Sequence, residues 1–221
     1  MICLRTKPYK LKLNAKDSAM YGTSPNDTIK IATPINVRAS LYALLGNLLL
    51  QVPDQATLER LAALEGSNGD IGSAVDTLSQ IAKSMNPGSV EREFNVLFIG
   101  VGRGEVLPYA SYYLTGFLHE KPLADLRAKM RSLGMQRKQG ISEPEDHLGA
   151  LCEMMAGMIT GAFGQPMPLQ TQKEFFNAHI APWASHCFSD LEKAENALLY
   201  APVGSLGRLF VEIEQESFRI E

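Results

Sequence analysis

The sequence contains little cysteine, and its cysteines form no recognisable motif. Among 221 residues there are three, Cys3, Cys152 and Cys187, and they lie far apart. Because no Cys-x-x-Cys pair occurs, the sequence indicates neither a zinc site nor a disulfide framework. A chain without disulfides suits a reducing compartment, so we expect a cytoplasmic protein.

Long apolar runs are also missing. The longest candidate, Leu41 to Leu50, is interrupted by Gly46 and Asn47, whereas a membrane-spanning helix needs roughly 18 apolar residues. Residues 1–20 carry five Lys or Arg side chains but no apolar segment of the kind that secretory signals contain. We therefore expect neither stable membrane insertion nor a secretory signal.

The net charge is small, −3, but it is unevenly distributed. Residues 1–30 hold six Lys or Arg and two Asp residues, whereas the remainder carries a net charge of −7. We expect residues 1–30 to form a basic, flexible N-terminal arm and residues 31–221 to form the folded domain. The acidic body argues against a nucleic-acid partner and is compatible with a cationic peptide, although the same charge also suits simple solubility.

Alternating strand patterns and internal repeats are absent, and apolar residues recur every three to four positions from Thr33 onwards. Pro182 opens a helix that is expected to reach about Leu199, and Ala201-Pro202 separates the last helix from it. We predict an all-α fold, a single domain of about nine or ten helices. The expected helices begin near residues 34, 54, 70, 89, 111, 122, 142, 169 and 182, and after residue 202.

The most distinctive stretch is Glu143-Pro144-Glu145-Asp146-His147, which precedes a long apolar segment. Ser142 and Glu145 have the spacing of a capping box, so we expect a helix to begin at Ser142 and to reach about Phe163. Asp146 and His147 would then lie in its first turn and point about 100° apart, unlike a hydrogen-bonded dyad. Because the positive end of a helix dipole disfavours a protonated imidazole, we expect a neutral His147.

This acid–imidazole pair admits three interpretations. It caps a helix at the edge of the core, it binds a ligand, or it catalyses a reaction; the first two fit equally well and the third less well. Catalysis would need a nucleophile, a metal or a cofactor, and none is visible in the sequence. His179 and His186 would align on one helix, but Pro182 interrupts it, so we expect no metal site.

A second cluster combines apolar and aromatic side chains with hydroxyl groups, and it has one part before residue 99 and another after residue 107. The segment Gly100–Gly104 lies between these two parts. It invites a nucleotide-binding interpretation, with Asn95–Ile99 as the preceding strand. The third glycine of a dinucleotide-binding loop would fall at Glu105, and no P-loop lysine follows, so a hinge between two helices is favoured. The cluster consists of Phe94, Leu97, Phe98, Pro108, Tyr109, Ser111 and Tyr113.

Five short motifs, taken in order, resemble those of the TorD/DmsD/NarJ group of redox-enzyme maturation chaperones, and the TorD-like branch most closely. The similarity covers roughly residues 35–200, and five motifs in one order are a specific signal. They are Arg38-x-x-x-Tyr42, Glu91-x-x-Phe94-x-x-Leu97-Phe98, Pro108-Tyr109-x-Ser111-x-Tyr113, Glu143-Pro144-x-Asp146-His147 and Phe175-Phe176-x-x-His179-Ile180-x-Pro182-Trp183.

The resemblance implies a cytoplasmic, all-helical chaperone with no catalytic residue, metal or cofactor of its own. Such a protein would bind the twin-arginine signal peptide and the body of a molybdoenzyme catalytic subunit, of the dimethyl sulfoxide reductase or formate dehydrogenase type. It would assist cofactor insertion and delay export. The peptide-contacting positions carried over are Phe94, Leu97, Phe98, Pro108, Tyr109, Ser111, Tyr113, Pro144, Asp146 and His147. Where some relatives have tryptophans, this chain has Phe94, Tyr109 and Tyr113.

The chemistry of the peptide agrees with these positions, since a twin-arginine signal is a cationic patch followed by an apolar segment. We expect Glu143, Glu145 and Asp146 to receive guanidinium groups, because charge-assisted hydrogen bonds to arginine are the stronger kind. The aromatic cluster would cover the apolar segment, as in helix-in-groove recognition.

Two alternatives stay open. One is a small helical nucleotide-binding protein or hydrolase that uses His147, Asp146 and the Gly100–Gly104 loop, and the resemblance is compatible with weak guanine nucleotide binding. The other is a helical scaffold that pairs with a single partner. Helices joined by glycine and proline could also exchange between two copies, so the sequence is compatible with a homodimer.

Overall fold

The computed structural model describes residues 34–137, 140 and 142–220. This part of the chain contains ten α-helices and one short π-helix. The predicted basic arm, residues 1–30, lies outside the described residues. The elements are α1 (Pro34–Leu50), α2 (Gln55–Ala62), α3 (Asp70–Ser84), α4 (Pro87–Phe94), the π-helix η2 (Asn95–Ile99), α5 (Ala110–Thr115), α6 (Lys121–Ser132), α7 (Leu148–Thr160), α8 (Leu169–His179), α9 (Ala184–Glu192) and α10 (Tyr200–Ile220).

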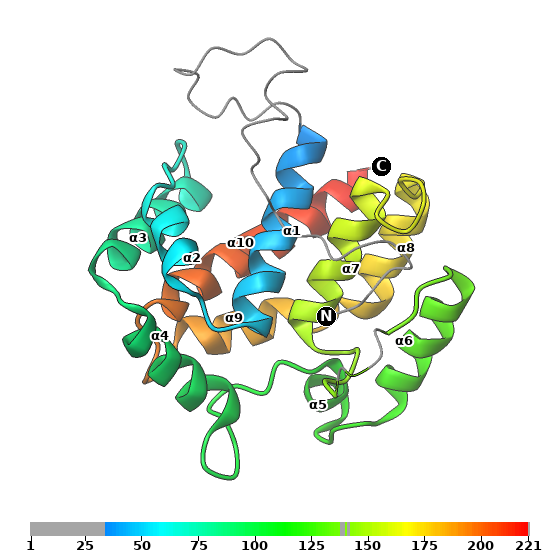
Figure 1. Cartoon of the computed structure of the whole chain (residues 1–221). Coiled ribbons are helices and arrows are strands. Elements are labelled where there is room, and N and C mark those ends of the chain that lie inside the picture. The colour runs from blue at the N-terminus through cyan, green and yellow to red at the C-terminus, as the bar shows by residue number, and fades with distance from the viewer. Residues whose placement is uncertain (1–33, 138–139, 141, 221) are drawn as a thin grey trace.

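Two helix pairs form the centre of the molecule (Figure 1). Helix α1 packs along α7 and α10 packs along α9, and these are the most extensive helix contacts among the described residues. Helices α2, α3 and α4 lie on one side of this centre, and α5, α6 and α8 lie on the other. A single isolated bridge, between Tyr109 and His147, is the one pairing of extended backbone in the described ranges. The prediction of an all-α fold is confirmed.

The helices surround a hydrophobic core whose members recur at helical spacing, as the sequence pattern predicts. Leu45, Leu48 and Leu49 of α1 are buried, and so is almost the whole of α7. Burying one such side chain contributes roughly 1.5–3 kcal/mol, so these stripes decide which face of each helix turns inward. The largest fully buried side chains are Trp183, Tyr42, Tyr200, Phe175, Phe176 and Phe188.

Two glycines set the distance between α1 and α7. A β-carbon on Gly149 would lie 2.7 Å from Cγ of Leu50 and 3.1 Å from the carbonyl oxygen of Gly46. The two backbones therefore approach more closely than a larger residue at this crossing would allow. Because Gly149 is the second residue of α7, the crossing also fixes where α7 begins, directly after His147.

A buried ion pair joins α1 to α10. Nε and Nη2 of Arg38 donate to the two carboxylate oxygens of Glu214, both at 2.7 Å, and the Tyr42 hydroxyl donates to the same carboxylate at 3.0 Å. Arg38 also donates to the side-chain oxygen of Gln172 on α8, at 3.3 Å. A bidentate pair of this kind fixes orientation as well as distance. Arg38 and Tyr42, which form the first of the five motifs, thus hold three helices together.

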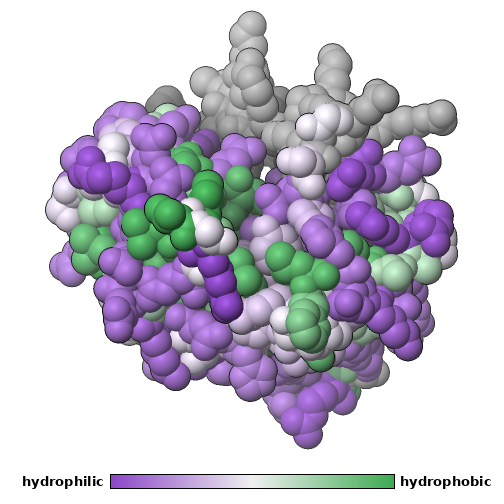
Figure 2. Space-filling model, turned by 90° about the horizontal axis from the view of Figure 1, so that it is seen from below, coloured by the Kyte–Doolittle hydropathy of each residue, from purple (hydrophilic) through white to green (hydrophobic). Residues whose placement is uncertain are grey.

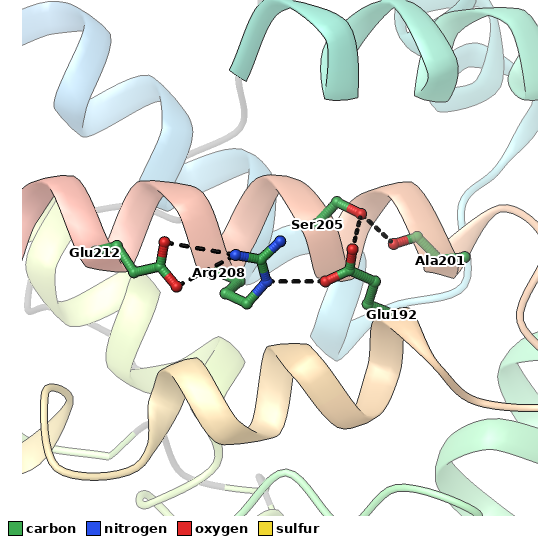
Figure 3. A network of polar contacts seen from close by, with 5 residues as sticks. All are labelled: Glu192, Ala201, Ser205, Arg208 and Glu212. Carbon is green, nitrogen blue, oxygen red and sulfur yellow. Dashed lines mark hydrogen bonds and ion pairs between the residues drawn. The ribbon is translucent and has the colours of Figure 1, made fainter. Parts of the chain in front are cut away.

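A more exposed network joins α9 to α10 (Figure 3). Glu192 at the end of α9 accepts hydrogen bonds from Nε of Arg208 and from Oγ of Ser205, each at 2.9 Å. The Arg208 guanidinium also reaches Glu212 one turn further along α10, at 3.3 Å. Because the Arg208 and Glu192 side chains are about 30% exposed, water screens the pair, and it stabilises the fold less than the buried pair does.

Several of the predicted elements differ from the observed ones. Asn95–Ile99, the strand of the nucleotide-binding interpretation, is a π-helix that continues α4. The helix after Pro182 begins at Ala184 and ends at Glu192, so its predicted extension to about Leu199 is wrong. Ala201-Pro202 does not separate two helices but lies in the first turn of α10. Proline is tolerated there because a first-turn N–H has no partner within its own helix.

Candidate functional site

The motif around His147 does not begin the long helix at Ser142. Helix α7 begins at Leu148, and His147 is its N-cap, whose Nδ1 accepts a hydrogen bond from the backbone N–H of Gly149 at 3.0 Å. The predicted capping box at Ser142 is therefore wrong. Pro144 supplies the reason, because the residue before a proline is driven out of helical geometry, and Glu143 would be the first helical residue.

Asp146 joins this loop to the start of α5. Its carbonyl oxygen accepts from the backbone N–H of Ala110 at 3.0 Å, and its carboxylate Oδ2 accepts from that of Ser111 at 2.8 Å. The carbonyl oxygen of Pro108 in turn accepts from the N–H of Leu148 at 2.7 Å. These bonds make Tyr109 and His147 neighbours on antiparallel backbone, so two motifs that are 35 residues apart form one site.

The side chains of Tyr109 and His147 meet edge to face, with ring centroids 5.1 Å apart. The Tyr109 hydroxyl donates to the carboxylate of Glu143, and burial together with this hydrogen bond raises the pKa of Tyr109. Burial lowers the pKa of His147 to about 3, so its imidazole is neutral near pH 7. The prediction of a neutral His147 is confirmed, although desolvation rather than the helix dipole is the main cause.

Glu145 forms ion pairs with two arginines and does not close a capping box. Its carboxylate lies 2.7 Å from Nη2 of Arg127 on α6 and 3.7 Å from Nε of Arg137. Burial by itself would raise the pKa of Glu145, but hydrogen bonding to Arg127 and the two positive charges bring it below its ordinary value. Arginines of the same chain therefore contact Glu145, one of the three carboxylates that the sequence assigned to peptide guanidinium groups.

The apolar half of the predicted site is largely internal. Leu97 is fully buried and Phe94 nearly so, while the partly exposed Phe98 packs edge-on against Tyr200, with centroids 5.2 Å apart. Glu93 reinforces this contact by accepting backbone N–H bonds from Leu198 and Tyr200, both at 2.8 Å. These motif residues therefore also anchor η2 to the beginning of α10.

The glycine loop after η2 is a tightly built turn. Gly100 has a φ of +63°, and a β-carbon on Gly104 would lie 2.6 Å from the backbone of Phe98, so both positions favour glycine. The Arg103 guanidinium lies over the Tyr112 ring, 5.0 Å from its centroid, and donates to its hydroxyl. Glu105 accepts backbone N–H bonds from residues 195 and 196. The loop is thus tied to α5 on one side and to the α9–α10 turn on the other.

Tyr113 extends the site towards α9. Its ring centroid lies 5.3 Å from that of Trp183, and its hydroxyl donates to Asp190 at 2.7 Å. Ser111, which begins the same turn of α5, is fully buried, and its Oγ accepts from the backbone N–H of His119 at 3.2 Å. Helix α5 therefore carries a partly exposed tyrosine that is held on both sides.

The predicted site residues divide into two groups. Partial exposure is retained by Phe98, Tyr109, Tyr113, Glu143 and Pro144, whereas Phe94, Leu97, Pro108, Ser111, Asp146 and His147 are buried. The structure brings both motifs together, but the buried members support the surface rather than form it.

Sequence reasoning missed the most exposed apolar residues of this face. One set, Val96, Ile99 and Val101, lies on η2 and its loop, and the other, Leu114, Phe117 and Leu118, lies at the end of α5. Figure 2 views the molecule from the side where η2 and α5 lie, and hydrophobic side chains gather there in neighbouring areas. Arg103, which follows the first set in the chain, contacts Tyr112 of α5, the helix whose end carries the second set. A helical wheel of Asn95–Ile99 could have found Val96 and Ile99, because residues three positions apart lie on the same face of a helix.

The described residues do not form a hydrolytic dyad from Asp146 and His147. The Asp146 carboxylate accepts from Ser111, and His147 Nδ1 is occupied by Gly149. No group of three or more His, Cys, Asp or Glu side chains that could hold a metal ion occurs among the described residues. The strand–turn–helix order of a phosphate-binding loop is not found in the described chain either, because the loop follows a π-helix and α5 begins only at Ala110.

A protein-family profile described as nitrate reductase delta subunit matches residues 65–189, a range that contains the whole site. Among curated proteins, the chain is similar to the chaperone protein TorD of Vibrio cholerae serotype O1, strain M66-2. The two are 25% identical over 163 residues, which cover 70% of this chain and 74% of that protein. The TorD chaperone of Aliivibrio salmonicida is 22% identical over 198 residues, covering 80% of this chain and 92% of the relative.

Among solved structures, the chain is similar to a crystal structure from Archaeoglobus fulgidus that is provisionally described as a redox enzyme maturation protein. The TM-score is 0.51 at 20% sequence identity, and the match covers 79% of this chain and 93% of the other. This similarity supports the fold. Within the described residues, no helix is long and apolar enough to span a membrane.

Proposed function

The chain belongs to the nitrate reductase delta subunit family, and from this premise we propose that it binds the twin-arginine signal peptide of a client enzyme. It is a TorD-like redox-enzyme maturation chaperone. The prediction of a chaperone rather than an enzyme is confirmed by the relatives, which are named chaperones.

One observation carries the proposal, namely the bridge between Tyr109 and His147. It accompanies a half-exposed Tyr109 ring that lies beside the Glu143 carboxylate. An aromatic ring next to a carboxylate suits arginine, because the guanidinium plane stacks on the ring while its N–H groups bond to the oxygens. Glu143 is thus the partly exposed carboxylate to which we assign the first arginine contact.

The apolar segment of the peptide would follow the exposed hydrophobic areas of the same face. Val96, Ile99 and Val101 lie on η2 and its loop, and the Arg103–Tyr112 contact links this loop to α5, whose end carries the second set. Apolar peptide side chains that cover these areas would remove hydrophobic surface from water, at roughly 25 cal/mol for each Å². A peptide with a cationic patch and an apolar segment would use both the carboxylate of Glu143 and these exposed apolar side chains.

We further infer that the client is the catalytic subunit of a molybdoenzyme, of the dimethyl sulfoxide reductase or formate dehydrogenase type. In this scheme the chaperone acts in the cytoplasm, holds the client while its cofactor is inserted and delays export. The acidic body supports a basic client segment through electrostatic complementarity. Isolation of the tagged full-length chain from its own cells tests the client. The main captured protein should carry a twin-arginine leader, and capture of a protein without one would reject the proposal.

Calorimetric titration with a synthetic twin-arginine leader tests the peptide site directly. We expect Tyr109→Ala to weaken binding about tenfold, as loss of an aromatic contact typically does. Asp146→Ala and His147→Ala should also weaken binding while the far-UV circular dichroism stays helical. Replacing both peptide arginines by lysine serves as the matched control, because lysine keeps the charge but cannot stack or bind in a bidentate way. Unchanged affinity of the folded variants would reject these positions as the site.

A further inference from the structure

Helix α5 lacks the side-chain cap that most short helices use. It has six residues, and its N-cap residue, Tyr109, makes no side-chain capping bond to any described residue. The first two N–H groups of the helix, those of Ala110 and Ser111, donate instead to the carbonyl oxygen and to the carboxylate of Asp146. An isolated helix of this length is unstable in water, so its position depends on contacts from outside.

The Asp146 side chain is poorly placed to bind a peptide. Its exposed fraction is 0%, and Oδ2 is already engaged by Ser111. The other oxygen, Oδ1, is buried and has no hydrogen-bond partner within the described part of the chain. Glu143, three residues earlier, is partly exposed and lies beside the Tyr109 ring. Two carboxylates of one loop therefore face different surroundings.

We propose that Asp146 is a positioning residue, which caps α5 from the neighbouring loop and so sets Tyr109 and Tyr113 without contacting the client. This inference rests on the proposed peptide binding. A carboxylate at the N-terminus of a helix bonds to free N–H groups and interacts favourably with the helix dipole. Tyr109 precedes the capped turn and Tyr113 follows one turn later, so a shift of α5 would move both rings together. The specificity for arginine then belongs to Glu143.

The acid-to-amide substitutions Asp146→Asn and Glu143→Gln separate the positioning role of Asp146 from the arginine contact of Glu143, and Asp146→Ala completes the set. Asp146→Asn keeps an oxygen that can accept from the backbone N–H of Ser111 but removes the charge. Asp146→Ala removes the acceptor as well. For a twin-arginine leader, we expect Asp146→Asn to stay within about twofold of the parent and Asp146→Ala to lose about tenfold or more. Glu143→Gln should lose affinity and flatten the salt dependence, while Asp146→Asn should keep the parent salt dependence. If Asp146→Asn loses as much affinity as Asp146→Ala, or flattens the salt dependence, the carboxylate contacts the peptide and the inference is overturned.

Hydrogen exchange of the free chaperone tests the cap without any peptide. In Asp146→Ala the amides of residues 110–116 should exchange about tenfold faster or more, whereas in Asp146→Asn they should exchange at nearly the parent rate. Amides of α10, distant from this loop, are the internal control. Unchanged exchange in Asp146→Ala would refute the cap whatever happens to binding. Failure of the unaltered chaperone to bind any twin-arginine leader would instead refute the proposed function and leave the exchange result to decide the cap.

Discussion

Glu214 is a position at which we expect a single substitution to destabilise the fold strongly. Its side chain is 3% exposed and makes a bidentate ion pair with Arg38. Glu214→Ala would leave the guanidinium and the Tyr42 hydroxyl without this acceptor. Removing one partner of a buried ion pair typically costs about 3–5 kcal/mol, and the 23% exposure of the Arg38 side chain lets water recover part of that cost. We therefore expect a loss of about 3 kcal/mol in the free energy of unfolding.

Urea unfolding followed by far-UV circular dichroism would measure this loss. A domain of this size loses about 2–4 °C in melting temperature for each kcal/mol, so the melting temperature should fall by about 6–12 °C. Glu216→Ala is the matched control on the same helix, because Glu216 pairs with Arg219 at the surface, where both side chains are more than half exposed. The control should change the unfolding free energy by less than about 0.5 kcal/mol.

The double substitution Arg38→Met with Glu214→Leu separates the two causes of the loss. Replacing a buried pair by apolar residues of similar size is often neutral, so the double variant should recover most of the stability. A loss of less than about 1 kcal/mol in Glu214→Ala would refute the reasoning, since the pair would then contribute no more than a surface contact. A double variant as unstable as the single one would show that packing, not the loss of the carboxylate from beside the guanidinium, sets the cost.

Three further outcomes are expected. The pKa of His147 is lowered from 6.5 to about 3. The stability that the neutral imidazole contributes is therefore complete above about pH 6.5 and is lost as the pH falls towards 3. The free energy of unfolding should fall by up to about 1.4 kcal/mol per pH unit in this range. Urea unfolding between pH 7 and pH 5 should show this dependence on pH. His147→Asn, which keeps a capping oxygen, should reduce it. An identical slope in the variant would show that His147 does not cause the pH dependence. Gly149→Ala should cost about 1–3 kcal/mol because its β-carbon meets Leu50, whereas Gly88→Ala, with no atom nearer than 3.5 Å, should be neutral or slightly stabilising in thermal melts. Leader binding should weaken with added salt in calorimetry, and a flat titration would indicate a purely apolar contact.

The predicted helices show which features could be read from local pattern. The apolar stripes of Pro34–Leu50 and Leu148–Thr160 predicted buried helices, because hydrophobic spacing acts along a single element. The predicted N-cap of α7, Ser142, lies five residues before the observed one, His147, since the capping-box spacing ignored the constraint that Pro144 places on Glu143. The end of α9 was wrong as well, because the α9–α10 turn is held by Glu105 and Glu93 from far along the chain.

The candidate site shows a similar division. Its residue types and their grouping into two motifs followed from the sequence, and the bridge between Tyr109 and His147 unites them. Burial of Asp146 and His147 could not be predicted, because Asp146 accepts hydrogen bonds from the α5 backbone and His147 packs against Tyr109, both about 35 residues earlier in the chain. For the same reason the sequence could not show that Arg127 of α6 and Arg137 of the following loop contact Glu145.

The sequence by itself determined an all-helical fold, the composition of the aromatic and acidic motifs and the likeness to maturation chaperones, since each depends on residue type and short spacing. Tertiary structure alone decided which motif residues are exposed to water and which are buried beneath that surface. The physical reason is that exposure and hydrogen-bond partners depend on which elements meet, and α5 meets both the loop before α7 and helix α9 through residues far apart in the chain.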